Sequence, residues 1–403
     1  MIDNIEIIGG LYGANIGNQQ YTTRNLTISD AQTCISQIWN WGWTYQGITL
    51  RNCGTAISMV NGGPGSQTVG SVIVLDSNIR NCRVFVDTVW QESTWSNGSL
   101  ILENVSLDNV PVAVQASNNT VLEGSTGPTK IEAWGQGHRY TPSGPDNFQG
   151  ALGPAQRPRS LLARDSSSYY AKSKPQYEKE EISSFVSVRQ AGAKGDGSTD
   201  DTSALQSALD TAARDHKIVF FDQGVYKVTR TLVFPPGSRI VGEAFPVIMA
   251  SGQTWSDIEN PVPVIQVGKP GDTGFIEWSD MLVSTQGSTP GAVLIEWNLA
   301  SDEGSGMWEV HTRIGGFAGS QLQAPECPTD AEISPRCEAA YMSMHITSSA
   351  SNVYLENVWL WTADHDLDDG HDTRISVYTG RGLLVEGKNI WLYVSDIRFD
   401  DLH

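Results

Sequence analysis

Three tryptophans alternate within one short segment and could bind a sugar chain. Trp39, Trp41 and Trp43 are separated by single residues, so on a β-strand their side chains would point to the same face. Aromatic rings stack on sugar rings, and three rings on one face would form a platform for glucosyl units. The alternative is a buried aromatic stack that only stabilises the core. Trp359 and Trp361 share a face by the same argument.

An acidic segment could add polar contacts to a sugar. Asp364-His-Asp-Leu-Asp-Asp-Gly-His-Asp carries five acids and two histidines in nine residues. We expect a loop that hydrogen-bonds sugar hydroxyl groups through Asp364, His365 and Asp366. A calcium site is a weaker alternative because it needs a defined ligand geometry, and a solvated turn is the plainest one. We expect no metal ion and no cofactor.

The charge balance narrows the partners. The chain has 403 residues, with 26 Lys and Arg against 45 Asp and Glu, a net charge of −19. Such a surface repels phosphate, which disfavours nucleic acids and anionic membranes. It also fits poorly with polyanionic polysaccharides such as pectate. A neutral glycan meets no such repulsion.

Other features indicate export from the cell, and we expect a secreted protein. No apolar window approaches the length of a membrane span, and the first residues lack the basic and apolar regions of a signal peptide. The first third contains four N-glycosylation sequons: Asn25-Leu-Thr, Asn97-Gly-Ser, Asn104-Val-Ser and Asn118-Asn-Thr.

The cysteines form two groups. Cys327 and Cys337 bracket a short Pro-rich loop and are predicted to form a disulfide, although two free thiols are the alternative. Cys34, Cys53 and Cys82 lie in repeated strand segments and are expected to be buried apolar fillers. No Cys/His spacing resembles a zinc site.

The first third shows an internal repeat. Apolar strand starts recur at Ile5, Leu26, Ile48, Val72 and Leu100, in steps of 21, 22, 24 and 28 residues. Strands at this period without helices predict a β-solenoid, in which each coil buries its apolar face on its neighbours. An antiparallel sandwich is the alternative.

The composition changes near Gly137, which suggests three regions. Residues 1–137 form the first solenoid, residues 138–185 are expected to be a linker rich in Pro, Ser and charge, and residues 186–403 form a second domain. That domain opens with a strand and a Gly-rich turn, followed by a helix through Arg214 that Thr199 or Asp200 would cap.

This opening resembles that of pectate-lyase-superfamily β-helix domains. The resemblance rests on Gly192-Ala-Lys-Gly-Asp-Gly-Ser-Thr-Asp-Asp-Thr, followed by a short helix and Gly-Val-Tyr. It implies an all-β, right-handed parallel β-helix whose open end the helix caps. It says little about function, because lyases, polygalacturonases and phage tailspikes share the architecture.

Further motifs resemble the fungal exo-β-1,3-glucanases of glycoside hydrolase family 55, over nearly the whole chain. The segments are Gly17-Asn-Gln-Gln-Tyr-Thr-Thr-Arg-Asn-Leu, Trp39-Asn-Trp-Gly-Trp-Thr, Gln67-Thr-Val-Gly-Ser-Val, Trp359-Leu-Trp-Thr-Ala-Asp-His-Asp-Leu-Asp and Tyr378-Thr-Gly-Arg-Gly-Leu-Leu-Val-Glu.

The resemblance implies two tandem β-helices and inverting hydrolysis of β-1,3-glucan from the non-reducing end by a monomer. In that mechanism Gln and Ser side chains would hold the attacking water, so Gln19 and Gln20 are the candidate catalytic residues. The alternative is that both belong to a structural Asn/Gln ladder. The candidate glucan-binding residues are Trp39, Trp41, Trp43, Trp361, Asp364, His365, Asp366 and Tyr378.

The family's general acid is the Glu of a Glu-His pair, and this chain has no match for it. Trp391-Leu-Tyr is followed by Val-Ser-Asp-Ile-Arg-Phe-Asp-Asp-Leu-His. Asp396, Asp400 and Asp401 do not fit the pattern. The first β-helix also begins in mid-solenoid, so we expect an interior piece of the enzyme with little hydrolase activity.

Two other functions compete with this one. A polygalacturonase would carry Asn-Thr-Asp, Gly-Asp-Asp and Gly-His-Gly elements, which do not occur, and a pectate lyase would need calcium and a basic catalytic residue. A non-catalytic glycan-binding β-helix would keep the aromatic platforms without the acid.

Overall fold

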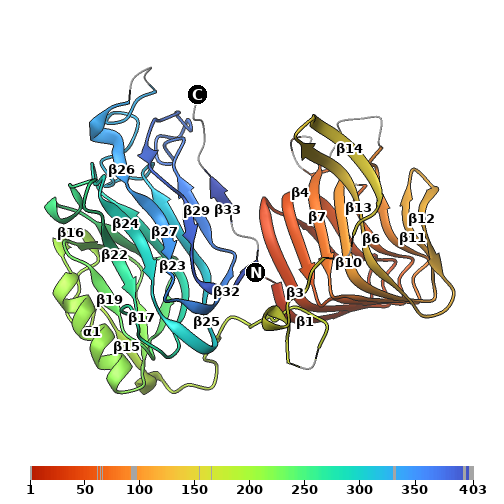
Figure 1. The fold of residues 1–403 in the computed structure, drawn as a ribbon, viewed down its shortest axis with the longest axis horizontal. Helices are drawn as coiled ribbons and strands as arrows, with labels where there is room; N and C mark the ends of the chain where they lie inside the picture. The colour runs from red at the N-terminus through yellow and green to blue at the C-terminus, as the bar shows by residue number, and fades with distance from the viewer. Residues whose placement is uncertain are drawn as a thin grey trace. The chain divides into compact units, whose positions relative to one another are not determined.

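The structure is a computed structural model that divides into two compact units. It describes residues 2–60, 62–63, 65, 67–91, 98–153, 155–164, 166–329, 333–393 and 396–398, with the backbone alone at 302–304 and 396–398. Unit 1 is Met1–Ala171 and unit 2 is Lys172–His403. Both consist mainly of β-strands (Figure 1). Of the described residues, none form a helix with the length and apolar character needed to cross a membrane.

Unit 1 is a β-solenoid, in which successive coils stack short strands on one another. Its strands are β1 (Ile2–Ile8), β2 (Tyr12–Gly17), β3 (Gln20–Ser29), β4 (Thr33–Gln46), β5 (Thr49–Arg51), β6 (Thr55–Ser58), β7 (Val69–Leu75), β8 (Asn78–Arg80), β9 (Val84–Thr88), β10 (Ser99–Asp108), β11 (Val110–Ala116), β12 (Asn119–Ser125), β13 (Thr129–Thr141) and β14 (Gly144–Ala151). Parallel pairing gives three ladders, β1-β3-β5-β8-β10, β3-β4-β7-β10 and β2-β4-β6-β9-β11. Strands β3, β4 and β10 each take part in two ladders.

The predicted repeat is correct in kind but mixes two ladders. Ile5 pairs with Leu26, and Thr27 pairs with Thr49, so the first two steps follow one ladder. The next partner of Thr49 is Asn78, 29 residues on (78−49). Val72 instead lies between Trp43 and Leu100 in the neighbouring ladder. Apolar spacing alone cannot distinguish the two ladders, because both bury alternate residues.

Antiparallel strands close the C-terminal end of unit 1. β12 pairs with β11, β13 pairs with β10, and β14 pairs with β13, all antiparallel. The linker expected at residues 138–185 therefore starts too early, since residues 138–151 lie within the β13 and β14 hairpin. Its Gly and Pro residues are typical of a linker, but residues 138–141 and 144–151 pair with each other or with the preceding part of β13.

Side-chain amides stack at the corners of the coils. Asn109, Asn81, Asn52 and Asp30 occupy one corner of successive coils, all with positive φ. Each of the three asparagines donates its side-chain N–H to the next oxygen in the column, at 3.0, 3.1 and 2.9 Å, and the Asp30 carboxylate accepts the last of these bonds. Asn and Asp tolerate this backbone conformation better than other non-Gly residues. The column therefore holds the bend and ties each coil to the one below it.

The cysteines of unit 1 are not all simple fillers. Cys34 and Cys53 form a disulfide across 19 residues, which corrects the expectation for these two. Cys53 follows the corner at Asn52, and Cys34 begins the strand of the coil below. Cys82 is a buried free thiol, as expected, and burial raises its pKa. The sequence missed the pair because 19 residues separate the partners along the chain.

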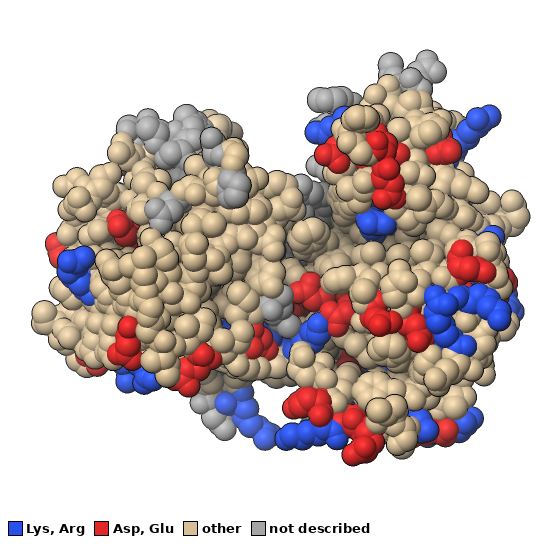
Figure 2. All heavy atoms as spheres, turned by 180° about the vertical axis from the view of Figure 1, so that it is seen from behind, with Lys and Arg blue, Asp and Glu red and all other residues tan. Residues whose placement is uncertain are grey.

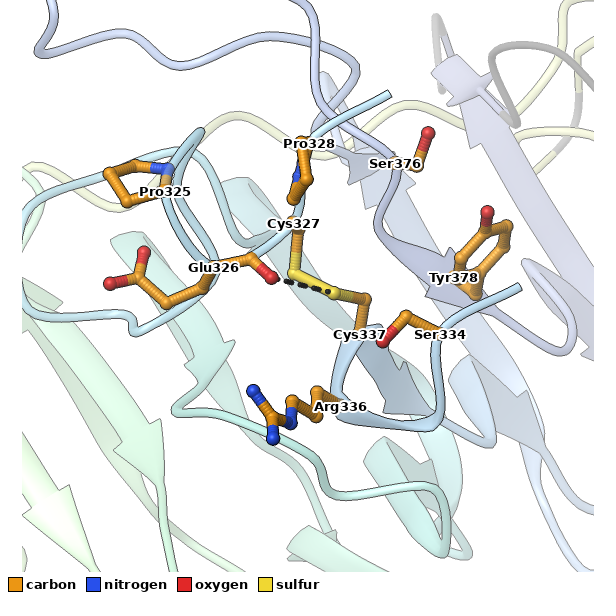
Figure 3. A pocket seen from close by; sticks show the side chains of 9 residues that line it. All are labelled: Pro325, Glu326, Cys327, Pro328, Ser334, Arg336, Cys337, Ser376 and Tyr378. Atoms are coloured by element: carbon orange, nitrogen blue, oxygen red, sulfur yellow. Dashed lines mark hydrogen bonds between the residues drawn. A yellow bond between two sulfur atoms is a disulfide. The ribbon is translucent and has the colours of Figure 1, made fainter. Parts of the chain in front are cut away.

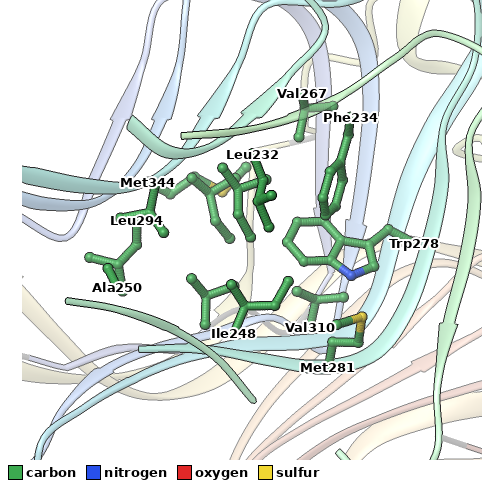
Figure 4. Close-up of a cluster of buried hydrophobic side chains, with 14 of the residues drawn as sticks. Leu232, Phe234, Ile248, Ala250, Val267, Trp278, Met281, Leu294, Val310 and Met344 are labelled. Carbon is green, nitrogen blue, oxygen red and sulfur yellow. The ribbon is translucent and has the colours of Figure 1, made fainter. Parts of the chain in front are cut away.

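Unit 2 repeats the solenoid plan. Its elements are β15 (Phe185–Ser187), β16 (Asp196–Asp200), α1 (Thr202–Arg214), β17 (Ile218–Phe221), β18 (Val225–Val228), β19 (Leu232–Phe234), β20 (Arg239–Gly242), β21 (Val247–Ala250), β22 (Val262–Val267), β23 (Glu277–Thr285), β24 (Ala292–Trp297), β25 (Ala300–Ile314), β26 (Glu338–Ala340), β27 (Met342–Ile346), β28 (Ser351–Glu356), β29 (Trp359–Thr362), β30 (Tyr378–Thr379), β31 (Leu383–Val385), β32 (Lys388–Tyr393) and β33 (Asp396–Arg398). The three main ladders are parallel, β15-β17-β20-β23-β25-β28-β32, β16-β18-β21-β23-β25-β29-β33 and β19-β22-β24-β27-β31. Large side chains such as Phe234 and Trp278, in edge-to-face contact at 5.0 Å, fill its interior (Figure 4).

The helix α1 covers the first coil of unit 2 (Figure 1). It buries Leu205, Ala208, Leu209 and Ala212 in the core and ends at Arg214, as predicted. Its N-cap is Asp201 rather than Thr199 or Asp200. The buried Asp201 carboxylate accepts the backbone N–H groups of Lys194 and Gly195 at 2.7 and 2.9 Å. This carboxylate therefore closes the Gly-rich turn against the helix start.

Charged residues of the segment between the last strand of unit 1 and the first of unit 2 bind carboxylates on each unit. In unit 1, Arg157 contacts Asp76 at 2.7 Å and also pairs with Glu103. In unit 2, Lys172 lies 3.1 Å from Glu277, and Lys174 pairs with Asp280. On the face in Figure 2, Lys and Arg lie beside Asp and Glu, and most of the described surface carries no charge.

We predict that Asp201→Ala lowers the free energy of unfolding by about 2–4 kcal/mol, because two N–H groups in a closed turn lose a charged acceptor. Urea titration of the full chain, followed by circular dichroism, measures the change. Asp210→Ala, an exposed acid on the same helix, is the matched control and should change stability by less than about 0.5 kcal/mol. Equal effects of the two substitutions would contradict this role of Asp201.

Candidate functional site

The carboxamides Gln19 and Gln20 lie at the start of β3, in unit 1. Gln20 pairs with Gly42 of β4, and both side chains are half-buried. Among the described residues, neither side-chain amide has a hydrogen-bond partner, whereas the Gln19 carbonyl accepts the N–H groups of Trp41 and Gly42 at 2.7 and 3.0 Å. Their side chains do not belong to an amide ladder, which leaves them available to a ligand or to water.

Trp39 is held between two glycines. A Cβ placed on Gly17 or on Gly63 would lie 2.4 or 2.3 Å from Trp39 Cδ1. No side chain larger than hydrogen therefore fits at either position while the indole keeps its place. The motif Gly17-Asn-Gln-Gln thus has a physical reason for its glycine, since a Cβ at this position would collide with the Trp39 ring.

The three tryptophans of β4 differ in how far they are exposed. Trp41 is 44% exposed, whereas Trp43 is 3% exposed and donates its Nε1–H to Thr23 Oγ1 at 3.1 Å. The ring of Trp43 packs against those of Tyr21 and Tyr45, at 4.9 and 5.8 Å, and β4 keeps one register with β7 from Asn40 to Gln46. The predicted platform is therefore wrong for Trp43, a core residue, while Trp39 and Trp41 remain candidates.

A buried polar group that the sequence did not indicate lies in the same strand. Tyr45 donates its hydroxyl to Gln37 Oε1, and Gln37 donates to the Trp39 carbonyl at 3.0 Å. Both side chains are fully buried, and burial raises the pKa of Tyr45 well above its usual value. The pair fixes the backbone at Trp39. Its only sequence signal is the alternation of polar and aromatic residues from Gln37 to Gln46.

In unit 2 the structure brings Trp361, Asp364 and His365 together. The rings of Trp361 and His365 lie 5.6 Å apart. Asp364 Oδ1 lies 2.6 Å from His365 Nδ1, and its other oxygen pairs with Arg374. These side chains are half-buried. An aromatic face beside a fixed acceptor and an imidazole can bind a sugar ring and its hydroxyl groups.

Asp366 has a structural role instead. It is 2% exposed and accepts hydrogen bonds from Gln323 Nε2 at 3.0 Å and from the Ala324 N–H at 3.1 Å. Burial alone would raise the pKa of Asp366, but these hydrogen bonds outweigh it and lower the pKa. The expectation that Asp366 binds the sugar is therefore wrong, because both of its oxygens face the protein.

Two further acids of this segment also accept hydrogen bonds from backbone N–H groups. Asp368 accepts the N–H of Ala318 at 2.6 Å, and Asp369 accepts those of His371 and Thr373. In the part of the chain that the structure describes, no three His, Cys, Asp or Glu residues gather as a metal site. The segment is thus a hydrogen-bonded loop rather than a cluster of free carboxylates.

Tyr378 lines a cavity of about 300 Å³ (Figure 3). The cavity surrounds the disulfide between Cys327 and Cys337, the pair expected from the sequence. Its wall also carries Glu326 and Arg336. Trp361, Asp364 and His365 do not line this cavity, although Thr362 and Thr379, the neighbours of Trp361 and Tyr378, share a hydrogen bond at 2.8 Å.

His311 is a further residue that the sequence did not indicate. It packs between the rings of Phe245 and Trp359, at 5.6 and 5.5 Å, and its Nδ1 accepts the Trp359 N–H at 3.1 Å. Burial lowers the pKa of His311 to about 4, although the Glu309 carboxylate opposes the shift. The imidazole is therefore neutral in the folded protein near neutral pH and orders the strand that carries Trp361.

The lowered pKa predicts a pH-dependent stability. Between about pH 6.5 and 4 the unfolded chain binds a proton at His311 that the folded chain refuses, so stability falls as the pH falls. The gap between the two pKa values corresponds to about 3 kcal/mol. His311→Asn removes the titration and keeps an acceptor for Trp359. Urea titrations at pH 7 and pH 4 should show a loss about 3 kcal/mol smaller in this variant, and equal losses would refute the assignment.

Comparisons with known proteins give the chain its relatives. The family model "Rhamnogalacturonase A/epimerase, pectate lyase-like" matches residues 1–58 and 185–302. A glucan 1,3-beta-glucosidase of Cochliobolus carbonum is 54% identical over 398 residues, which cover 97% of this chain and 50% of the relative. A probable glucan endo-1,3-beta-glucosidase of Arthroderma benhamiae is 37% identical over 96% of this chain and 55% of its own.

The chain thus spans about half the length of these curated relatives. Among solved structures, sacteLam55A of Streptomyces sp. SirexAA-E aligns with 94% of this chain and 68% of its own, at 14% identity and a TM-score of 0.35.

Proposed function

Since the chain belongs to the sequence family of these fungal β-1,3-glucanases, we propose that it is part of a glycoside hydrolase that acts on β-1,3-glucan. The observation that carries the proposal is the similarity to a glucan 1,3-beta-glucosidase over almost the whole of this chain. A neutral glucan is also compatible with the net charge of −19.

Two groups of residues support the proposal, one in each unit. In unit 1, the exposed Trp41 and the ring of Trp39 lie on the strand that pairs with the start of β3, where Gln19 and Gln20 carry unengaged carboxamides. In unit 2, Trp361 stands beside the paired Asp364 and His365. We assign glucan binding to the aromatic rings and the orientation of water to Gln19 or Gln20.

The finer features are proposals as well. They are attack at the non-reducing end with inversion, an architecture of two tandem right-handed β-helices, a monomeric state and secretion. Inversion requires a general acid on one side of the scissile bond and an activated water on the other. Carboxamides can orient such a water but cannot accept its proton, so Gln19 and Gln20 would position the water rather than act as the base.

A second candidate function, glucan binding with little turnover, is favoured by the carboxyl groups. A general acid must hold its proton near neutral pH, which requires a raised pKa. Hydrogen bonds instead lower the pKa values of Asp366 and Asp369. The Asp364 carboxylate forms an ion pair with Arg374. Among the described residues of the candidate site, no carboxyl group is placed as an acid.

We predict that Trp41→Ala weakens binding of laminari-oligosaccharides by about 5- to 10-fold, since stacking contributes roughly 1 kcal/mol. Isothermal titration calorimetry measures the affinity. Tyr140→Ala removes an aromatic ring that is 84% exposed on β13 and should leave the affinity unchanged. Unchanged affinity in both variants would remove Trp41 from the site.

For the chain as given, we predict that glucose release from laminarin stays near the rate of the buffer blank, while binding persists. A coupled glucose assay at saturating laminarin checks this. Turnover in the range typical of enzymes, about 1–1,000 per second, would contradict this interpretation of the described carboxyl groups and favour the fully catalytic alternative.

A further inference from the structure

The four sequons of unit 1 differ in what the fold does with their asparagines. Asn25, Asn104 and Asn118 are described by the structure, and Asn97 lies outside the described residues. An N-linked glycan is attached to the side-chain nitrogen and needs open space around it. The contacts of each asparagine therefore decide which sequon can carry a glycan in the folded protein.

Asn118 lies in the two-residue loop that joins β11 and β12. Ala116 pairs with Asn119 across the hairpin, and Ser117 and Asn118 have φ of 50° and 64°, as a type I′ turn requires. Residues 117–120 are all exposed. Among the described residues, the Asn118 side chain has no hydrogen-bond partner. Its nitrogen therefore faces solvent, and so does Thr120, which completes the sequon.

Asn104 is held in the opposite way. Its side-chain N–H donates to Asp76 Oδ1, in a carboxylate whose side chain is 2% exposed. Arg157 donates to the same oxygen at 2.7 Å, and the Tyr169 N–H donates to the other at 2.9 Å. A glycan on Asn104 would have to displace the segment that carries Arg157 and Tyr169. The fold and a glycan at this position exclude each other.

Asn25 is intermediate. Its side chain is exposed, but its nitrogen donates to Asn4 Oδ1 at 3.0 Å in an amide ladder between coils. A glycan there would compete with the ladder rather than with a covering segment.

The disulfides supply a second, independent observation. Cys34–Cys53 and Cys327–Cys337 are both bonded, and disulfides persist in the oxidising compartments through which glycoproteins pass. We propose that Asn118 carries an N-linked glycan in the folded, exported protein and that Asn104 does not. This inference does not rest on the proposed function.

The test is site mapping on the full chain, secreted from a yeast host behind a secretion leader. Folded protein is treated with peptide N-glycosidase in heavy-oxygen water, which labels each asparagine that carried a glycan, and peptides are read by mass spectrometry. We expect the label at Asn118 and none at Asn104. An unlabelled Asn118, or a labelled Asn104, in the secreted protein would overturn the proposal.

Matched variants link the label to the sequon. Thr120→Ala should remove one glycan from the gel mobility of the secreted protein, whereas Thr120→Ser keeps the sequon and the mobility. Ser106→Ala removes the sequon of Asn104 while its asparagine stays, and it should change nothing. A mobility shift with Ser106→Ala, or none with Thr120→Ala, would contradict the assignment. Mapping of the unaltered chain remains decisive if a variant is not secreted.

Discussion

The whole architecture depends on the register with which one coil lies on the next. Each parallel ladder repeats the same residue position in successive coils, so one amino acid type must suit a column rather than a single site. The corners show this most clearly. One column has the same positive-φ backbone at each corner, and its side chains are hydrogen-bonded from one coil to the next: Asn109, Asn81, Asn52 and Asp30. A single slip in register would break every bond of the column and turn apolar residues outward.

The same constraint decides which residues can serve a ligand. Along a regular strand, alternate side chains face the core. A side chain that contacts a ligand must therefore lie on the outer face or at a place where the inner face is exposed. Trp41 and Trp43 lie in a stretch of β4 with constant register, yet the ring of Trp41 is exposed and that of Trp43 is buried. The Gln19 carbonyl accepts the N–H groups of Trp41 and Gly42, so the backbone of the carboxamide segment holds the backbone that carries Trp41.

The sequence predicted the features that follow from local patterns, and it missed the contacts between residues that lie far apart along the chain. The strand spacing indicated a solenoid, and the Gly-rich opening indicated α1, because both rest on local patterns. The sequence did not predict the disulfide between Cys34 and Cys53 or the antiparallel pairing of β13. Each joins residues that come together only when the coils stack. The sequence cannot distinguish an Asp366 that binds a ligand from one that accepts backbone N–H groups, because both are a carboxylate in a polar loop.

The ends of a solenoid are prone to pairing with another chain, because an uncovered coil presents unpaired strand edges. Unit 2 covers its first coil with α1, and unit 1 covers its last described coil with antiparallel strands. An antiparallel strand saturates part of a parallel edge but cannot continue the ladder, so it stops further stacking. The loop at Ser117 and Asn118 projects from this closing layer, beside β12. A glycan there would occupy solvent next to the terminal strand, where a second chain would otherwise approach edge to edge. The antiparallel strands and the glycan would then both protect this strand edge. The strands do so by reversing direction, and the glycan does so by its bulk.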